Sequence, residues 1–289
     1  MPTITQAIAE GAARLGASGI DQERRTAGLL LCQVLRIDRT HLLTGSEKPI
    51  DERQYRNYLA LVERRAAGEP LQYITGHQEF YGLDFIVTPD VLIPRPETEF
   101  LIERVMKLVS ESIQDSPLIV DVGTGSGCIA VTIAKLLPRA RLIATDASSA
   151  ALNIAQRNAE CHGVRDRIEF LEGDLLAPLA ERRLEGAVDI LASNPPYVNE
   201  DGRQFLQREV RDWEPREALF GGADGLDFYR RLLAEAPRLL KPAGHVVLEI
   251  GFSQFEAISE IVNGSALRLH DVTRDLQDIP RIICLRSTV

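Results

Sequence analysis

The chain has 289 residues, of which 45% are hydrophobic and 26% charged, as expected of a globular protein with room for a catalytic domain and a smaller one. Its formal net charge of -9 argues against a large nucleic-acid footprint, because phosphate binding needs clustered Lys and Arg. The first 75 residues carry ten basic and nine acidic side chains, and the remainder carries 23 and 33. Neither part has the large excess of basic residues that is expected of a protein that wraps around DNA.

The N-terminal segment MPTITQAIAE has neither a basic nor a long apolar stretch, and no window approaches the ~18 apolar residues of a membrane span. We therefore expect a cytoplasmic protein that does not bind membranes. Four cysteines are scattered without metal-like spacing: Cys32, Cys128, Cys161 and Cys284. They predict reduced, buried thiols and no structural zinc.

Residues 1–75 are predicted to form a small helical domain. Thr3 is placed to cap a first helix, Asp21 a second and Asp51 a third, each followed by apolar residues at helical spacing. Gly68 and the proline that follows it two positions later end the third helix.

Residues 76–97 predict a β-hairpin linker. Gly82, Pro89 and Pro94 interrupt three short β-like runs, which are Glu79–Tyr81, Phe85–Val87 and Val91–Ile93.

From residue 98 to 289, strands and helices are predicted to alternate. The expected strands are Leu118–Val122, Arg141–Thr145, Ile168–Leu171, Val188–Ala192, His245–Ile250, Leu267–Val272 and Ile282–Leu285. The expected helices are Ile129–Leu136, Ala150–Cys161, Leu226–Leu240 and Phe255–Val262. Repeated βα units predict an α/β domain with a mainly parallel sheet covered on both faces, and ligands bind such sheets at the carboxyl ends of the strands.

A Gly-rich loop, Gly123-Thr124-Gly125-Ser126-Gly127, follows the first of these strands. Its spacing is G-x-G-x-G and differs from the G-x-G-x-x-G of dinucleotide folds. Asp121 lies just before it, where it would repel a pyrophosphate but attract a cofactor that carries an ammonium and a sulfonium. The alternative is a tight turn without a ligand.

Two further carboxylates close the next two strands. Asp146 is placed to accept hydrogen bonds from ribose hydroxyls, and Asp174 from an adenine amino group, although either alone could be a solvated cap. Together with Asp121 and the Gly-rich loop, they resemble the class I methyltransferase pattern. That resemblance implies a Rossmann-like fold with an antiparallel last strand. It also implies S-adenosylmethionine as the cofactor, with S-adenosylhomocysteine as the product.

The segment Asn194-Pro195-Pro196-Tyr197 follows the strand at residues 188–192. One interpretation is that the prolines merely end the strand and that Tyr197 is a core aromatic. The functional interpretation explains all four residues. The Asn194 side-chain oxygen and the Pro195 carbonyl would each accept one N–H of a planar nitrogen, direct its lone pair at the methyl group and stabilise the growing positive charge. Tyr197 would pack on the flat substrate, and no general base is required.

This segment resembles the signature of methyltransferases that act on planar nitrogens of DNA, ribosomal RNA or protein glutamine. Its flanks resemble the HemK/PrmC family, the release factor glutamine methyltransferases: they are Pro94–Glu99, Glu209–Pro215 and Ala218–Arg230. The resemblance covers nearly the whole chain. It implies methylation of the Gln in the Gly-Gly-Gln motif of peptide chain release factors.

The resemblance also implies individual roles. Asn194, Pro195, Pro196 and Tyr197 would hold the Gln amide, and Asn194 would also border the cofactor. The cofactor would otherwise be lined by Asp121, Gly123, Thr124, Gly125, Ser126, Gly127, Asp146, Asp174 and Leu175. Some relatives have an aromatic residue in place of Leu175, which leaves its role open.

Several questions stay open at this level. Arg95 either contacts substrate or braces the hairpin, and Trp213 is either functional or a packing anchor. Residues 198–222 read as a substrate-facing loop. We expect a monomer whose helical domain (1–75) recognises the protein substrate. The rival functions are a ribosomal-protein glutamine methyltransferase, a nucleic-acid amino-methyltransferase and a non-catalytic binding protein.

Overall fold

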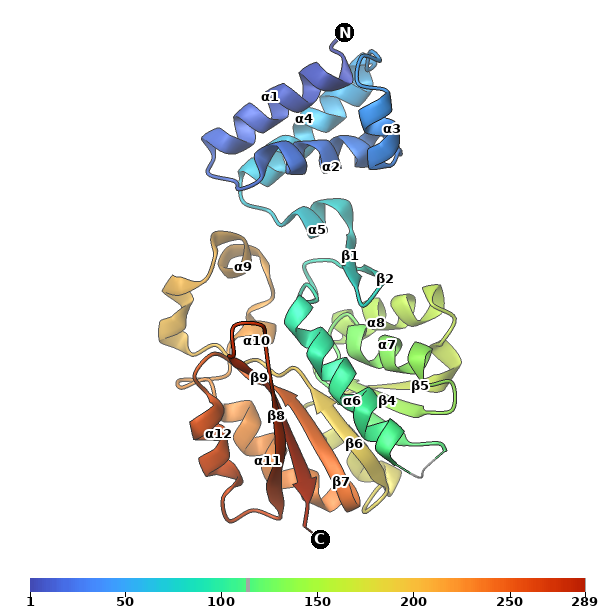
Figure 1. Ribbon diagram of the computed structural model, residues 1–289, viewed down its shortest axis with the longest axis vertical. Helices are drawn as coiled ribbons and strands as arrows, with labels where there is room; N and C mark the ends of the chain where they lie inside the picture. The colour runs from blue at the N-terminus through green and yellow to red at the C-terminus, as the bar shows by residue number, and fades with distance from the viewer. Residues whose placement is uncertain (113–114, 289) are drawn as a thin grey trace. The chain divides into compact units, whose positions relative to one another are not determined.

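The computed structural model describes residues 1–112 and 115–288 (Figure 1). Contacts between residues divide the chain into two compact units. The first comprises Met1–His77 together with Gln207–Trp213, and the second comprises Gln78–Leu206 together with Glu214–Val289. How far these units correspond to separate functions stays a prediction.

The first unit is helical, as expected. Its helices are α1 (Ile4–Ala17), α2 (Glu23–Leu35), α3 (Arg39–Thr44), α4 (Glu52–Ala66), α5 (Leu71–Thr75) and α9 (Arg208–Trp213). Thr3 and Asp51 cap α1 and α4 through reciprocal capping boxes, which confirms both predicted starts. The prediction for Asp21 is wrong. The chain enters α2 through Gln22 in a left-handed conformation, φ 51°, and that turn gives α2 no side-chain cap in the described chain.

Interlocking apolar side chains hold this unit together. Leu15, Leu30 and Tyr58 are fully buried between α1, α2 and α4. Gly11 lets α1 approach α4, because a Cβ at this position would lie 1.9 Å from the Tyr58 hydroxyl oxygen. Residues 207–213 join the unit through an ion pair of 2.6 Å between Arg65 and Glu209.

A β-hairpin is formed by β1 (His77–Phe80) and β2 (Leu83–Ile86), and all of its residues except His77 belong to the second unit. Phe80 and Phe85 pack edge to face, with ring centroids 6.0 Å apart. The third β-like run, Val91–Ile93, is not a strand, so that prediction is wrong. The Val91 amide closes a turn by donating to the Thr88 carbonyl and is therefore not available to pair with a strand.

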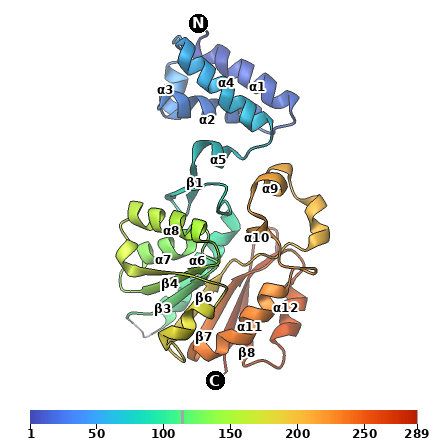
Figure 2. The ribbon, with the colours of Figure 1, turned by 180° about the vertical axis from the view of Figure 1, so that it is seen from behind.

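The second unit is built on a seven-stranded sheet in the order β5-β4-β3-β6-β7-β9-β8 (Figure 2). Its strands are β3 (Leu118–Val122), β4 (Arg141–Asp146), β5 (Ile168–Glu172), β6 (Val188–Ser193), β7 (Leu240–Glu249), β8 (Leu267–Arg274) and β9 (Pro280–Ser287). The pairs from β5 to β7 are parallel, whereas β9 runs antiparallel to both β7 and β8. The predicted mainly parallel sheet with an antiparallel last strand is confirmed.

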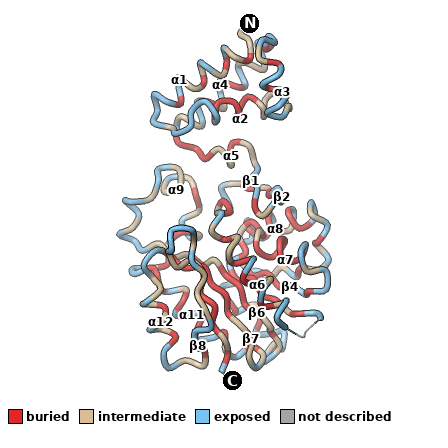
Figure 3. Tube along the Cα trace, in the orientation of Figure 1, coloured by how far each residue is buried: buried red, intermediate tan, exposed pale blue. Residues whose placement is uncertain are grey.

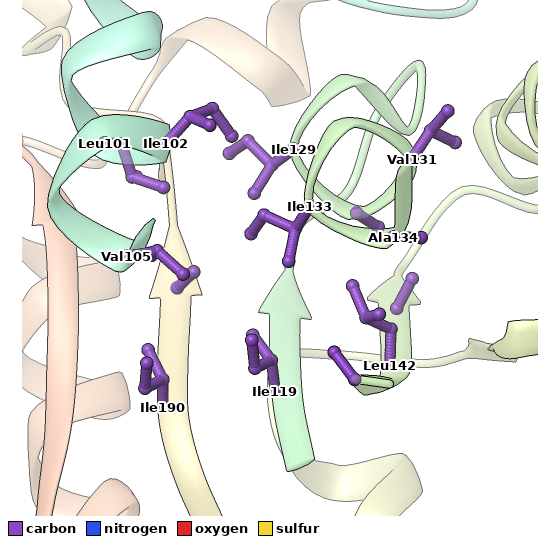
Figure 4. Packing of buried hydrophobic residues seen from close by; sticks show 14 of the residues in the cluster. Leu101, Ile102, Val105, Ile119, Ile129, Val131, Ile133, Ala134, Leu142 and Ile190 are labelled. Carbon is purple, nitrogen blue, oxygen red and sulfur yellow. The ribbon is translucent and has the colours of Figure 1, made fainter. Parts of the chain in front are cut away.

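Helices cover both faces of this sheet. Figure 4 shows Leu101 and Val105 of α6 (Glu99–Glu111) packing over Ile119 of β3 and Ile190 of β6, in a layer shared with α7 (Cys128–Leu136) and α8 (Ser149–Cys161). The next residue of β3, Val120, points to the opposite layer, formed by α11 (Asp227–Leu239) and α12 (Phe255–Val262). The central strands are accordingly buried on both sides (Figure 3).

None of the helices in the described ranges is long and apolar enough to cross a membrane.

The expectation of buried thiols is only partly right. Cys284 is buried in β9, but Cys161 is exposed, because it ends α8 at the turn that leaves the helix.

Candidate active site

A cavity of about 320 Å³ lies at the carboxyl ends of β3, β4, β5 and β6. It is lined by Asp90, Val91, Leu92, Gly123, Gly125, Asp146, Ala147, Ser148, Ala151, Gly173, Asp174, Leu175, Asn194, Pro196, Pro215, Glu217, Ala218 and Phe228. This is the sheet edge at which parallel α/β folds bind ligands. The cavity brings six of the predicted cofactor residues together with Asn194 and Pro196 of the predicted acceptor residues, Asn194 belonging to both sets.

The Gly-rich loop forms one wall through its backbone. Gly123 and Gly125 line the cavity with φ values of 72° and 56°, and no described atom lies within 4 Å of where a Cβ would stand. Gly127, with φ 82°, packs instead on Ala155 of α8, where a Cβ would lie 3.0 Å from the alanine Cβ. Only glycine adopts such conformations at little cost.

Asp121 lies behind this wall and is fully buried. Its Oδ2 accepts hydrogen bonds from the Thr124 hydroxyl at 2.6 Å and from the Ala130 amide at 3.1 Å. Burial raises the pKa of this carboxyl to about 7. Asp121 therefore holds the loop in shape and places negative potential beneath it.

Asp146, at the end of β4, lines the cavity and accepts hydrogen bonds from the amides of Gly125 at 2.8 Å and Ser148 at 2.9 Å. Burial raises the pKa of its carboxyl. Asp174 also lines the cavity and forms an ion pair with Arg231 of α11.

Six of the predicted cofactor residues line the cavity: Gly123, Gly125, Asp146, Asp174, Leu175 and Asn194. Four do not belong to its lining in the described chain: Asp121, Thr124, Ser126 and Gly127. Asp121 and Thr124 bond to each other beneath the loop. Leu175 reaches the cavity in a left-handed conformation, φ 49°, while its carbonyl accepts from the Thr145 hydroxyl at 3.0 Å.

Asn194 and Pro196 form the facing wall, whereas Pro195 is buried and Tyr197 half-buried. The Asn194 side-chain Nδ2 donates to the Thr98 hydroxyl at 3.1 Å, and that hydroxyl donates to Glu249 Oε2 at 2.6 Å. Thr98 and Glu249 are 1% and 2% exposed. Neither residue was assigned a role from the sequence, although Thr98 stands in the Pro94–Glu99 element.

Tyr197 contacts the same carboxylate. Its hydroxyl lies 3.5 Å from Glu249 Oε1, and burial raises the pKa of Glu249 to about 7. The Tyr197 carbonyl accepts a hydrogen bond from Gln254 Nε2 at 3.0 Å. Tyr197 and Asn194 thus both connect to Glu249, at the end of β7.

Two glycines lie close to the backbone of the Asn194–Tyr197 segment. A Cβ on Gly221 would lie 2.4 Å from the Pro196 carbonyl oxygen, and one on Gly225 would lie 2.4 Å from that of Tyr197. Both glycines belong to the Ala218–Arg230 element, but the sequence did not predict that they lie against Pro196 and Tyr197.

Arg95 pairs with Glu214 at 2.6 Å, and the Ile93 amide donates to the other oxygen of the same carboxylate at 3.3 Å. The Glu214 side chain is 1% exposed. Arg95 therefore holds the segment that begins at Glu214, from which Pro215 and Ala218 line the cavity. This contact favours the bracing interpretation of Arg95 over a substrate contact. The other lining residues that sequence reasoning missed include Phe228, whose helical spacing is equally typical of a core residue.

Comparison with known proteins agrees with this geometry. Residues 6–76 match the PrmC N-terminal domain, and residues 97–210 match the methyltransferase small domain. A release factor glutamine methyltransferase of Koribacter versatilis is 43% identical over 99% of both chains. One of Moorella thermoacetica is 46% identical over 90% of this chain and 89% of its own.

Solved structures share the fold at lower identity. A methyltransferase from Pyrococcus furiosus superimposes with a TM-score of 0.52 at 18% identity, over 81% of this chain and 99% of its own. The catalytic domain of METTL16 gives 0.57 at 18% identity, over 79% and 82%. The near-complete coverage at more than 40% identity assigns the family: this chain belongs to the release factor glutamine methyltransferases.

Proposed function

We propose that this enzyme transfers a methyl group from S-adenosylmethionine to the side-chain amide nitrogen of the Gln in the Gly-Gly-Gln motif of peptide chain release factors. The observation that carries the proposal is the position of Asn194. Its side-chain amide borders the same cavity as the Gly-rich loop, and its nitrogen is already engaged by Thr98. An oxygen acceptor is thereby available for the N–H of a substrate amide.

The residues of the cavity fit the cofactor. Gly123 and Gly125 leave open space at the wall that any side chain would fill. In this proposal Asp146 accepts hydrogen bonds from the ribose hydroxyls, and Asp174 accepts one from the adenine amino group. The carboxylates of Asp121 and Asp146 favour a ligand that carries positive charge. Gly123–Gly127, Leu175 and Asn194 complete the proposed cofactor site, in which the buried side chains of Asp121, Thr124 and Ser126 support the loop backbone.

The cofactor supplies an electrophilic methyl group on a sulfonium. Asn194 Oδ1 and the Pro195 carbonyl each accept one N–H of the Gln amide, which turns the nitrogen lone pair toward that methyl. Both acceptors stabilise the positive charge that grows on the nitrogen as its new bond to carbon forms. One amide proton then leaves to solvent, so a strong general base is not needed. Pro196 and Tyr197 shape the slot that holds the planar amide.

Labelled S-adenosylmethionine tests the substrate. Release factors and ribosomal proteins are incubated separately with the enzyme, and incorporation is measured. We expect label in release factors. Label that enters only ribosomal protein supports a sister glutamine methyltransferase, and label that enters nucleic acid supports a base methyltransferase. Cofactor binding without transfer to any acceptor supports the non-catalytic alternative.

We further propose that the helical domain grips the release factor away from the methylated Gln. The PrmC N-terminal domain match over residues 6–76 supports a conserved role for this part of the chain. Removing residues 1–76 should raise KM for folded release factor at least about tenfold, and leave KM for a short Gly-Gly-Gln peptide within about twofold. Cofactor affinity and circular dichroism serve as controls for folding. Equal effects on both substrates contradict this role.

A further inference from the structure

Asn194 is linked to a buried carboxylate through one hydroxyl. Asn194 Nδ2 lies 3.1 Å from Thr98 Oγ1, and Thr98 Oγ1 lies 2.6 Å from Glu249 Oε2. The three residues come from the turn after β6, the 3₁₀ helix at Pro96–Thr98 and the end of β7. They are distant in sequence and meet only in the folded chain.

While Glu249 is ionised, the number of protons available sets the direction of both hydrogen bonds. An ionised carboxylate only accepts hydrogen bonds, and a threonine hydroxyl has a single proton to donate. The Thr98 hydroxyl donates that proton to Glu249, so it can only accept a hydrogen bond from Asn194. The Asn194 side chain must therefore present its NH₂ group to Thr98, and its oxygen is left for the opposite side.

The surroundings keep this arrangement in place. The Thr98 amide donates to the Arg95 carbonyl at 3.1 Å, and the Tyr229 hydroxyl donates to the main-chain oxygen of Glu249 at 2.9 Å. Because Thr98 and Glu249 are almost fully buried, water does not compete for their hydrogen bonds.

We propose that Thr98 and Glu249 are positioning residues that fix the side-chain amide of Asn194 in the orientation whose oxygen accepts the substrate N–H. In the flipped orientation the NH₂ group would face the substrate N–H, and two donors repel each other. The inference rests on the proposed function, because a substrate amide is what the Asn194 oxygen would hold.

Protonation of Glu249 releases the constraint. A protonated Glu249 can donate to Thr98, whose hydroxyl is then free to donate to the Asn194 oxygen and to stabilise the flipped amide. Burial, assisted by Glu97, raises the pKa of Glu249 to about 7, while Thr98, Arg281 and Tyr197 oppose the shift. The active form is the ionised one, so kcat at saturating cofactor should fall as the pH drops below about 7.

Thr98→Val tests the proposal, because it keeps the shape of the side chain and removes the hydroxyl. We expect kcat to fall about 100-fold, with cofactor affinity unchanged within about twofold. Thr98→Ser should restore kcat to within about threefold of wild type. The matched control is Thr132→Val in α7, since the buried Thr132 hydroxyl has no hydrogen-bond partner among the described residues, and this variant should keep wild-type kcat.

The pH profile separates positioning from a structural role. The fall in kcat below pH 7 should vanish in Thr98→Val, because Glu249 no longer reaches Asn194 through a hydroxyl. A Thr98→Val enzyme with kcat within twofold of wild type and the wild-type pH profile overturns the proposal. So does a Thr98→Ser enzyme as impaired as Thr98→Val.

A measurement without turnover distinguishes this proposal from the proposed function. The side-chain NH₂ signals of Asn194, assigned by their loss in Asn194→Ala, should exchange with solvent about tenfold faster in Thr98→Val than in wild type. Unchanged exchange refutes the hydrogen bond, whichever acceptor the enzyme methylates. If wild type does not methylate release factors but the exchange rate rises as expected, only the proposed substrate fails.

Discussion

The hydrogen bonds of the Gly-rich loop at residues 123–127 reach groups 3 to 32 residues away in sequence, whereas those of the Asn194–Tyr197 segment reach groups 52 to 96 residues away. Asp121 holds Thr124 from three residues away, and Asn158 holds Ser126 from 32 residues away. The Asn194–Tyr197 segment depends on Thr98, 96 residues before Asn194, and on Glu249, 52 residues after Tyr197.

The Gly-rich loop (the cofactor wall) and the Asn194–Tyr197 segment (the acceptor wall) also differ in what they offer a ligand. The loop offers backbone and open space, which glycine alone provides at positive φ. The Asn194–Tyr197 segment offers an oriented side-chain acceptor. The glycines of the loop therefore suffice to recognise the cofactor wall in the sequence, whereas the orientation of the Asn194 side chain is set by Thr98 and Glu249, which the sequence does not connect to it. The following variants separate the contributions of the two walls and are given in order of decreasing expected effect.

Asn194→Ala should damage the acceptor wall far more than the cofactor wall. We expect a loss of about 1,000-fold in kcat, because the variant removes an acceptor for the N–H that becomes acidic during transfer. Cofactor affinity, measured by calorimetry, should change less than about fivefold, because the rest of the cavity wall is intact. Near-normal turnover in this variant would refute the proposed geometry.

Gly221→Ala tests the same wall through its backbone. The new Cβ would lie 2.4 Å from the Pro196 carbonyl oxygen, so that segment must shift. We expect kcat to fall about 100-fold with cofactor affinity retained, as measured by steady-state kinetics and calorimetry. If cofactor affinity falls as much as kcat, the two walls are not independent.

Gly125→Ala should damage the cofactor wall. The methyl group would enter the cavity at φ 56°, so we expect cofactor affinity to fall about tenfold, while kcat at saturating cofactor changes little. Gly163→Ala is the matched control. Gly163 has φ 67° and open space in the turn after α8, so it carries the same backbone strain outside the cavity. Equal loss of affinity in both variants would mean that strain, and not the cavity wall, causes the effect.

The sequence predicted strands β3 to β6 to within one residue at each end, because each is a short, mainly apolar run. The prediction for β7 is wrong at its start: the strand begins at Leu240 and not at His245, because Leu240 pairs with Val188 of β6. Predictions from the sequence failed where contacts within the folded chain determine the local structure. Val91–Ile93 has strand-like composition but closes a turn, and Asp21 has a capping side chain but lies one residue too early.

The contacts of the acceptor wall could not be predicted from the sequence either. Asn194 stands out in the sequence because two prolines follow it at a strand end. Nothing in the sequence connects it to Glu249, since the register of β6 with β7 and the start of α6 bring them together. Phe228 likewise reaches the cavity from a helix whose pattern is that of a core element.

The proposed reaction is tested most directly by mass spectrometry of a release factor after reaction with the wild-type enzyme and, in parallel, with Asn194→Ala. We predict one added methyl on the side-chain nitrogen of the Gly-Gly-Gln glutamine with wild type, and none with the variant at equal cofactor saturation. A methyl on another residue, or equal methylation by both enzymes, would contradict this prediction.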